Sequence, residues 1–411
     1  MSEQATIAVI GAGAIGTAAA CALAREGRKV LLLDRAEPGV AGASFGNAGH
    51  IAQELVQPLP SPGLLFGFYR DLFRFGGTLD LPPRQALRMA PWIGRFAAAA
   101  FRRSENTGHL APLARASVDA WARMLGAIGR PELLNRPGHY EIALGRGSHA
   151  RVAAHALDMA GVEVKTRPLD TERLEPLMRA AKASTAAGLW FEDSANVVDP
   201  LEAVRAFAHA ALHGDSTFRR LDVKALRPRG DKIEILSDEP ALVADSVLVC
   251  AGVRSAPLLA PFGLHAPLQA VRGYHVEMPG HAAYFDAPLV YMDERVIVTP
   301  MTGRLRATSF MEFADADAPP DPRKPARLRQ ILRSLGYTCE LQGSSWMGSR
   351  PVLPDYLPGI GRAPGFPKLF YAIGHQHIGL TLAPITAELI ADLVAERAPR
   401  LAVAAYDLQR F

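Results

Sequence analysis

The spacing of apolar residues predicts that the chain begins with an open parallel sheet. A β-branched apolar run at 5–10 ends in the glycine-rich stretch 11–16, and an alanine-rich helix pattern continues to Gly27. The next apolar run, at 29–34, has the composition and length of a second strand. A strand, a helix and another strand joined this closely indicate a right-handed crossover, and hence a doubly wound α/β sheet.

The segment after this unit turns irregular and then helical. Residues 42–63 are rich in Gly, Ser, Asn and Pro, which predicts an extended loop. Helix patterns follow at 64–75 and 84–103, and a further helix is expected from Pro112 to Ile128. A helical region is therefore expected between the first sheet unit and the strands that come later.

Strand and helix patterns alternate through the middle of the chain. Strands are expected at 139–145 and 188–200, with a helix at 149–161 between them. A helix at 201–212 leads into a strand, a hairpin and a strand at 218–253. This return to a βα pattern indicates that the chain re-enters its first domain.

The last part of the chain is rich in strands and ends in a helix. Strand patterns fill most of 263–343, and a helix pattern occupies 323–336. From 346 onward we expect a loop, a strand, a glycine-rich turn and a long helix. The order of these patterns predicts a first domain that is interrupted by pieces of a second.

Composition and charge narrow the class of protein. The chain has 411 residues, 49% of them hydrophobic, and a formal net charge of +4 at pH 7. Its basic residues are scattered, so nucleic acid is not expected as a partner. Three cysteines without paired spacing favour a reducing compartment, and neither a signal peptide nor a membrane-spanning helix is expected. A cytoplasmic protein is therefore predicted.

A glycine motif marks the turn between the first strand and the first helix. Gly11, Gly13 and Gly16 form GxGxxG, and Asp34 ends the second strand. Glycines at these positions permit a tight turn, close approach of the backbone to a pyrophosphate and close packing of helix on strand. The helix dipole suits the pyrophosphate, and the Asp34 carboxylate can accept hydrogen bonds from a ribose. The motif predicts a dinucleotide cofactor but does not by itself distinguish NAD from FAD.

Three further stretches resemble the D-amino acid oxidase family of FAD-dependent oxidoreductases. The first is the Gly-Ala-Ser and Asn-Ala-Gly cluster at 42–49, and the second is the strand that ends at 249–252. The third, within 346–382, contains Gly-x-Arg-Pro, Pro-Asp and Gly-His-x-x-x-Gly-x-Thr. Within the family, the chain is most similar to bacterial D-amino acid dehydrogenases. The string GNAGHIA followed by PLPSPG resembles members that oxidise D-hydroxyproline or related cyclic D-amino acids.

The resemblance implies an α/β fold of two domains. It implies a Rossmann-like FAD-binding domain, with an inserted substrate domain built on a mixed or antiparallel sheet. The FAD-binding domain is expected to comprise 1–62, 196–258 and 344–411, and the substrate-binding domain 63–195 and 259–343.

The resemblance also implies a reaction. A small amino acid, such as D-hydroxyproline or D-proline, is expected to be oxidised to the imino acid by hydride transfer to the flavin. One alternative is an enzyme of the same fold that acts on glycine or on N-methyl amino acids such as sarcosine. Another is an FAD-binding subunit of a hetero-oligomeric dehydrogenase. A third, allowed by the glycine motif alone, is an NAD-dependent dehydrogenase.

The cofactor-binding residues are expected in the glycine turn, the loop at 42–49, two later strand ends and the start of the last helix. They are Gly11, Gly13, Ala14, Ile15, Gly16, Asp34, Arg35, Ala43, Ser44, Asn47, Ala48, Gly49, Val223, Ala251, Gly252, Gly374, His375, Gly379, Leu380 and Thr381.

Four residues are the candidates for contact with the substrate. Arg350 lies in Gly-x-Arg-Pro, whose arginine holds the substrate carboxylate in the family, and guanidinium binds carboxylate in two places. Related dehydrogenases place a histidine near the substrate amine, at the position of His50. Tyr291 and Tyr274 could each add a hydroxyl to the carboxylate site or belong to the core. His375 begins an HxH pair, but no further ligands follow it, so no metal is expected.

The stretch 64–103 is rich in Trp, Phe and Arg. The pattern favours an active-site cover or core helices. The alternative is an amphipathic element on the inner face of the cell membrane. The sequence does not distinguish quinone, dye and oxygen as the electron acceptor. It allows a monomer as well as an oligomer.

Overall fold

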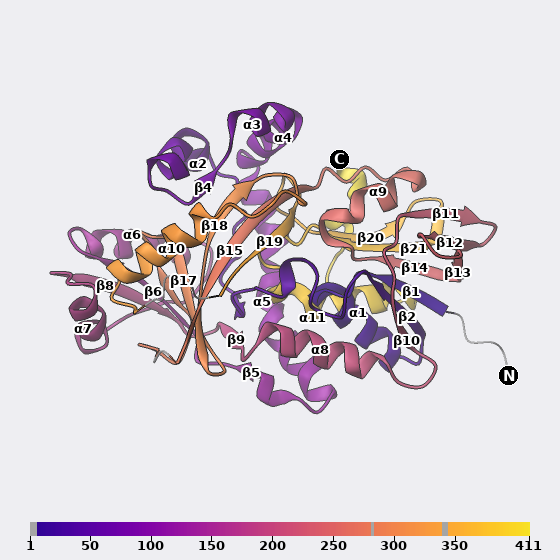
Figure 1. Ribbon diagram of the computed structural model, residues 1–411, viewed down its shortest axis with the longest axis horizontal. Helices are drawn as coiled ribbons and strands as arrows, with labels where there is room; N and C mark the ends of the chain where they lie inside the picture. Colours follow the sequence, from indigo (N-terminus) through magenta and orange to yellow (C-terminus); the bar gives the residue numbers. More distant parts are fainter. Residues whose placement is uncertain (1–5, 281–282, 339–343) are drawn as a thin grey trace.

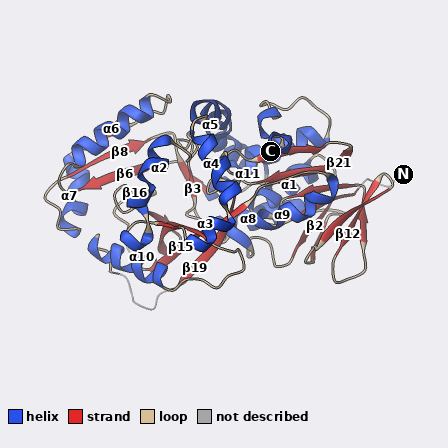
Figure 2. Ribbon diagram, turned by 90° about the horizontal axis from the view of Figure 1, so that it is seen from above, coloured by secondary structure: helices blue, strands red, loops and turns tan. Residues whose placement is uncertain are grey.

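Two sheets lie side by side along the long axis of the molecule (Figure 1). The computed structural model describes residues 6–280, 283–338 and 344–411. Figure 2 shows helices α6 (Ser148–Ala160) and α7 (Thr171–Ala180) at the end of the molecule opposite the N-terminus. The N-terminal strand belongs to the sheet at the other end.

The first sheet has six strands in the order β10-β2-β1-β14-β21-β20. Neighbouring strands are parallel, except that β20 and β21 are antiparallel. Their bounds are Thr217–Arg220 for β10, Lys29–Asp34 for β2, Thr6–Ile10 for β1, Ser246–Val249 for β14, Phe366–Ile373 for β21 and Gly359–Ala363 for β20.

Helices cover one face of this sheet, and a small sheet covers the other. The helices are α1 (Ala14–Arg25), α8 (Pro200–Ala211) and α11 (Gly379–Val394), with α5 (Arg103–Ala127) packed on α11. Ala18, Ala19 and Ala20 of α1 are fully buried, which lets its backbone pack closely against its neighbours. On the opposite face lie β11 (Ala225–Arg229), β12 (Lys232–Leu236), β13 (Leu242–Ala244) and α9 (Ser255–Leu259).

The second sheet has nine strands in the order β19-β15-β18-β17-β16-β6-β8-β7, with β4 paired to β18. It is mixed, because β16 pairs with β6, and β4 with β18, in parallel. Its strands are β19 (Ser345–Val352), β15 (Gln269–Pro279), β18 (Arg304–Phe313), β17 (Val296–Met301), β16 (Leu289–Tyr291), β6 (His139–Leu144), β8 (Ala186–Phe191), β7 (Arg167–Pro168) and β4 (Leu79–Asp80).

Smaller elements join the two sheets. A three-stranded sheet contains β3 (His50–Ile51), β9 (Ala195–Val197) and β5 (Leu134–Asn135). Helix α10 (Arg323–Ser334) packs on β15 and β18. Helices α2 (Pro62–Gly67), α3 (Pro83–Arg88) and α4 (Ala90–Ala100) lie together at one edge of the molecule (Figure 1).

The expected fold class, a Rossmann-like α/β unit joined to a mixed sheet, is confirmed. The first sheet is not doubly wound as expected, because β11, β12 and β13 cover most of its second face in place of crossover helices. The predicted domain boundaries remain a proposal. The boundary at 344 would place β19 with the first domain, whereas the hydrogen bonds of this strand join it to β15 in the second sheet.

Several expected elements have other bounds in the structure. The helix expected to start at Pro112 begins nine residues earlier, at Arg103. Proline inside a helix clashes with the residue four positions before it. That residue here is Gly108, and burial of one face of the helix outweighs the lost hydrogen bond.

The other differences arise where one pattern spans a turn. The strand expected at 188–200 is two strands, β8 and β9, in different sheets. The helix expected at 64–75 ends at Gly67, and short 3₁₀ turns at Phe68–Asp71 and Phe73–Phe75 follow. None of the helices in the described part of the chain is long and apolar enough to cross a membrane.

Candidate active site

A cavity of about 550 Å³ lies where the two sheets meet. Its walls include the carboxyl ends of β1, β2, β14 and β21 on one side and residues of β15 and β19 on the other. Ligands of open α/β sheets bind at the carboxyl ends of the strands. The cavity is therefore the candidate active site.

The glycine turn forms one end of the cavity. Gly11 has φ of +108°, and a Cβ atom there would lie 2.3 Å from the carbonyl oxygen of Cys250. A Cβ atom at Gly16 would lie 1.8 Å from the carbonyl oxygen of Gly11. Only glycine fits at either position, so the turn packs directly against β14 and α1 starts right behind it.

The side chains of Asp34 and Ser44 fix the position of this turn by hydrogen bonds to its backbone. The Asp34 carboxylate accepts hydrogen bonds from the backbone N–H of Ala12 at 2.6 Å and of Ala36 at 3.1 Å. The Ser44 hydroxyl accepts from the N–H of Ala14, at 2.9 Å, in the first turn of α1. The helix N-terminus thus opens on the cavity, as a pyrophosphate site requires.

Most of the predicted cofactor residues border this one cavity. Gly16 and Gly49 do not, because Gly16 packs beneath the turn and Gly49 packs against Val197 and Pro200. The predicted residues that line it are Gly11, Gly13, Ala14, Ile15, Asp34, Arg35, Ala43, Ser44, Asn47, Ala48, Val223, Ala251, Gly252, Gly374, His375, Gly379, Leu380 and Thr381.

The turn between β21 and α11 forms another wall. The His375 ring points away from the cavity, since its Nε2 lies 3.1 Å from the Thr386 hydroxyl, and burial lowers its pKa to about 3. Only its backbone can serve a cofactor. The Thr381 hydroxyl accepts from the N–H of Ala52 at 3.0 Å and thereby ties the start of α11 to the loop that carries His50.

Arg350 faces the cavity from β19. Its Nη1 donates to the carbonyl oxygen of Phe310 at 2.9 Å, and no carboxylate of the described residues pairs with it. A Cβ atom at Gly273 would lie 2.1 Å from Nη2, so glycine on the neighbouring strand makes room for the guanidinium. Burial lowers the pKa of the guanidinium, but arginine remains charged in proteins. This fixed positive charge can bind an anionic ligand.

Neither predicted tyrosine offers a hydroxyl to that ligand. Tyr274 borders the cavity, but its hydroxyl donates to Glu312 at 2.6 Å and accepts from the N–H of Asp321 at 3.0 Å. Tyr291 lies outside the cavity, fully buried, with its hydroxyl 2.9 Å from that of Tyr337. Tyr291 was predicted to contact the substrate, but side chains alternate between the two faces of a strand. On β16 the neighbouring Val290 is the residue that borders the cavity.

His50 borders the cavity on β3, and a small group of polar side chains surrounds it. Its Nε2 lies 3.4 Å from Oε1 of Glu54, and the centre of its ring lies 4.5 Å from that of His139. Burial lowers the pKa of His50 to about 4, although Glu54 partly opposes this. The imidazole is therefore neutral near pH 7 and can accept a proton.

Among the cavity residues that were not predicted as site residues, Gln376, His377 and Trp346 have side chains suited to a ligand. Gln376 is buried, and both polar atoms of its amide lack a partner among the described residues. His377 faces the cavity near Arg350, and burial lowers its pKa to about 4. Trp346 fits between Gly46 and Gly348, where Cβ atoms would lie 1.9 and 2.0 Å from its ring. Gln376 and His377 could have been found, because they lie in the glycine-rich turn Gly374–Ile378, which was expected to contact the cofactor. Nothing in the sequence indicated Trp346.

These features fit a dinucleotide such as FAD. The glycine turn provides close backbone approach at one end, and the orphaned Gln376 amide needs a polar ligand at the other. The residues that would hold the ligand come from the first turn of α1, the end of β2, the loop at 42–49 and the turn before α11.

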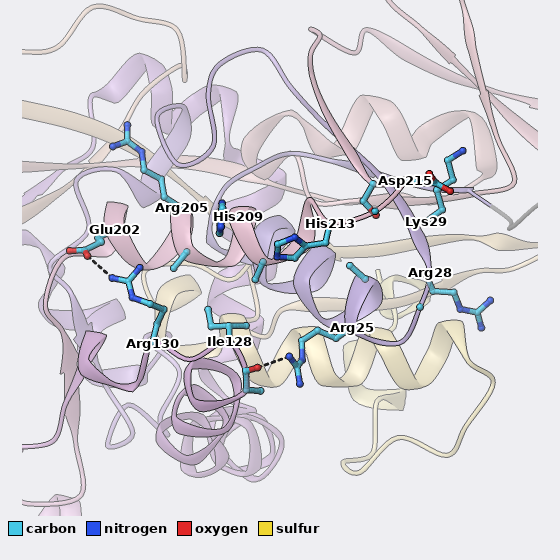
Figure 3. Close-up of a pocket in the computed structure, with 17 residues that line it drawn as sticks. Arg25, Arg28, Lys29, Ile128, Arg130, Glu202, Arg205, His209, His213 and Asp215 are labelled. Atoms are coloured by element: carbon cyan, nitrogen blue, oxygen red, sulfur yellow. Dashed lines mark hydrogen bonds and ion pairs between the residues drawn. The ribbon is translucent and has the colours of Figure 1, made fainter.

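A second, more open hollow of about 1070 Å³ lies between α1 and α8. Figure 3 shows exposed basic side chains around it, with Arg130 paired to Glu202 at 2.8 Å. None of the predicted site residues lines this hollow. We therefore assign the chemistry to the cavity between the sheets.

Comparisons with known proteins agree with this site. The family model for FAD-dependent oxidoreductases matches residues 6–393. The chain is 31% identical to a D-amino acid dehydrogenase 2 of Ralstonia nicotianae, over 98% of this chain and 100% of that protein. It is 29% identical to a D-amino-acid oxidase of Bradyrhizobium diazoefficiens, over the full length of both chains.

Solved structures show the same fold at lower identity. A glycine oxidase of Geobacillus kaustophilus superposes with a TM-score of 0.75 at 20% identity, over 99% of this chain and 100% of that one. An L-proline dehydrogenase of P. horikoshii superposes with a TM-score of 0.72 at 17% identity, over 100% and 98% of the two chains. The chain therefore belongs to the family of FAD-dependent oxidoreductases, and it is an enzyme whose cofactor is FAD.

Proposed function

We propose that this enzyme oxidises a small amino acid, D-configured or cyclic, to the corresponding imino acid. The observation that carries the proposal is the Arg350 guanidinium, which faces the cofactor cavity and has no carboxylate partner among the described residues. A half-buried positive charge without a carboxylate partner is incompletely compensated, and a substrate carboxylate would supply that partner. An amino acid brings that carboxylate together with an amine.

Each side chain has one task in this reaction. Arg350 binds the carboxylate and so fixes the orientation of the α-carbon, which supplies much of the rate of such reactions. His50, neutral near pH 7, takes the proton that the substrate ammonium must lose. FAD, when bound, accepts the hydride from the α-carbon. The first-turn amides of α11 present a positive dipole end to the same cavity.

The names of the relatives support D-amino acids as the substrate class. Two relatives that match the whole chain are named D-amino-acid oxidase and D-amino acid dehydrogenase 2. D-Proline and D-hydroxyproline are our first candidates, from the string that begins at Gly46. Glycine and sarcosine are the second, and the fold shared with a glycine oxidase is consistent with them.

One assay separates these candidates. Purified protein is mixed with a dye acceptor and D-proline, D-hydroxyproline, D-alanine, sarcosine or glycine, with the L-enantiomers as controls. We expect the highest kcat/KM for a D-amino acid. Preference for glycine or sarcosine would favour the second candidate. A lone chain that binds FAD but oxidises none of them would favour a subunit of a larger dehydrogenase.

We further propose that the segment 62–101 rests on an anionic membrane surface. Six of the nine exposed large hydrophobic side chains of the described residues lie in or next to it, and Phe66 and Leu87 are 76% and 79% exposed. Such a cluster is unusual on a soluble surface. Helix α4 also packs inward through Trp92, so only part of the segment is exposed. The six side chains are Phe66, Phe68, Tyr69, Phe75, Leu87 and Phe101.

Basic side chains accompany these aromatic ones. Arg70, Arg74, Arg84 and Arg88 are exposed in the same segment, whose helices lie together at one edge of the molecule (Figure 1). Aromatic and basic side chains together suit the interface of a bilayer with anionic lipids, where a quinone acceptor would be available.

Sedimentation with lipid vesicles tests this contact. We expect the protein to pellet with vesicles that contain phosphatidylglycerol and much less with phosphatidylcholine alone. Phe66→Ser combined with Leu87→Ser should abolish pelleting. Leu157→Ser, at a position 76% exposed on α6, should not change it. Equal pelleting of both variants, or loss of a dimer only in the first, would contradict a membrane contact.

A further inference from the structure

Imidazoles and carboxylates alternate from the cavity towards the surface beside His50. His50 Nε2 lies 3.4 Å from Glu54 Oε1, which in turn lies 3.7 Å from Nε2 of His139. The same His139 nitrogen lies 3.3 Å from Oε1 of Glu141, and the other oxygen of Glu141 lies 2.8 Å from Nε2 of His155. Each step joins a proton donor or acceptor to the next within reach of a small side-chain movement.

Different elements bring these groups together. His50 lies on β3, Glu54 follows that strand, and His139 and Glu141 are two residues apart on β6, so they share one face. His155 comes from α6, which packs on β6. His50 and Glu54 are more than 80 residues away from His139, Glu141 and His155 in the sequence. The series therefore exists only in the folded protein.

Exposure falls from 9% at His50 to 0% at His139 and then rises through 15% at Glu141 to 25% at His155. The side chains of Glu54 and His139 are 5% and 0% exposed, whereas that of His155 is 25% exposed. Glu54 and Glu141 also border the cavity. One end of the series therefore lies at the active site, and the other end meets solvent.

The carboxylate and imidazole groups of the series stabilise one another's charged forms. Burial raises the pKa of Glu141, but hydrogen bonds from His139 and His155 outweigh it and lower the pKa to about 2. Burial lowers the pKa of His139, and Glu54 and Glu141 reverse this. The hydrogen bond to Glu141 raises the pKa of His155, and Asp158 adds to it.

Stability alone does not account for this group. The desolvation of a buried ion pair usually costs about as much free energy as the attraction between its charges contributes. Apolar side chains of the same size would stabilise the core equally well. The group is also incompletely satisfied, since His50 Nε2, His139 Nδ1 and His155 Nε2 are buried and make no hydrogen bond of good geometry among the described residues. The Ser194 hydroxyl, 2.5 Å from Glu54 Oε2, fixes that carboxylate in place.

We propose that Glu54, His139, Glu141 and His155 form a proton path that carries the substrate's amine proton from His50 to solvent. The proposal rests on the proposed function. The substrate ammonium loses one proton as an N–H bond breaks and an N–H bond forms on the imidazole of His50. Bound FAD would supply the acceptor for the α-hydrogen and its two bonding electrons, which leaves the imino acid. His50 then gives up a proton from Nε2, each group of the path accepts one and releases one, and one proton enters solvent at His155.

The variant that tests the path is His155→Gln, at its solvent end. Its matched control is His149→Gln, which lies on the same helix and is exposed. Flavin bleaching by substrate is followed anaerobically in both variants and in wild type, from pH 6 to pH 10. Bound FAD is first quantified by absorbance, so that loss of cofactor is not mistaken for slow proton transfer.

We expect His155→Gln to bleach about 10-fold more slowly below pH 8, where the substrate amine is protonated. The difference should disappear near pH 10, where less of the amine must lose a proton on the enzyme. Added imidazole should restore the rate of this variant and leave His149→Gln unchanged. Glu141→Gln, which interrupts the path inside the protein, should be slow as well and should not respond to imidazole.

Three results would overturn the path. The first is a rate of His155→Gln equal to that of His149→Gln at every pH, with wild type active, which would leave the proposed function intact. The second is one divalent metal ion per chain in active enzyme, because these side chains would then be ligands. The third is wild-type protein that oxidises no amino acid, which would overturn the proposed function as well.

Discussion

At the scale of single residues, the position of the Arg350 guanidinium depends on the absence of a side chain at Gly273. Gly273 can have no side chain, because a Cβ atom would lie 2.1 Å from the guanidinium of Arg350. The guanidinium in turn is held by one hydrogen bond to the carbonyl oxygen of Phe310, whose φ is 71°. Its remaining N–H groups are free to bind a carboxylate in a planar fork.

Arg350→Ala should therefore lower kcat/KM by roughly 30- to 1000-fold, the equivalent of about 2–4 kcal/mol of lost charge-assisted contact. Arg350→Lys keeps the charge but loses the fork, so its kcat/KM should lie in between. Steady-state kinetics with free amino acids and with their amides measures the effect. The amide should lose much less than the acid. Loss of FAD from Arg350→Ala, or unchanged kcat/KM, would refute the carboxylate site.

His50→Ala should lower kcat/KM by roughly 100-fold or more while FAD stays bound, because a positioned base is lost. The pKa of His50 is about 4, so the wild-type imidazole is already neutral above pH 5. The deficit should thus be largest where the substrate amine is protonated and should shrink towards pH 10. A pH profile parallel to that of wild type would show that His50 only supports the loop.

At this scale the sequence predicted the motifs but not the direction of side chains. The glycines, Asp34 and Arg350 could be found because each lies in a short pattern with a fixed spacing. Tyr291 could not be placed, since its orientation depends on which face of β16 meets the cavity. His139, Glu141 and His155 become neighbours of His50 only through the pairing of β3, β9 and β6 with their neighbours.

At the scale of elements, the turn from β1 into α1 positions the cofactor. A Cβ atom at Gly13 would lie 3.1 Å from the Ser44 hydroxyl, in the direction of the cavity. Gly13→Glu should place a negative charge where pyrophosphate would bind, so the protein should purify colourless. Gly126→Glu, at an exposed helix position with nothing within 4 Å, is the control. Full FAD occupancy in Gly13→Glu, measured by absorbance, would rule out the phosphate turn.

The turn before α11 makes stability depend on pH. His375 is buried beside Thr386, and its pKa falls from 6.5 to about 3. Because its folded pKa is depressed, its contribution to stability is complete above pH 6.5 and is lost as the pH falls towards 3. His375→Asn should therefore lose less stability than wild type between pH 6 and pH 4, by about 1 kcal/mol per pH unit. Thermal midpoints measured across this range test it, and parallel curves would contradict it.

The elements with a single clear period were predicted, and those interrupted by a turn were not. The strands β1 and β2 match their patterns because both of their faces are apolar and pack in two cores. The helices α1 and α8 match because one apolar face of each packs in the first of these cores. The helix α5 passes through Pro112 because packing outweighs the lost hydrogen bond. The regular pattern at 64–75 breaks into short turns, since most of its apolar side chains find no core to pack against.

At the scale of the whole molecule, the site exists because two sheets face one cavity. The first sheet supplies the glycine turn and the end of β2, and the second supplies Arg350, while β3 brings His50 between them. The sequence indicated both sheets and their interleaved order along the chain. Their contact, and hence the neighbourhood of His50 and Arg350 in one cavity, depends on long-range packing that no local pattern contains.

Anaerobic titration of the purified protein with D-proline, D-alanine and glycine tests the central proposal most directly. We expect a yellow protein with a flavin spectrum, and we expect a D-amino acid to bleach it in a single turnover. The same titration with Arg350→Ala should leave the spectrum of the resting protein unchanged and slow the bleaching. A colourless protein, or a bound flavin that none of these amino acids reduces, would contradict an FAD-dependent amino acid oxidation.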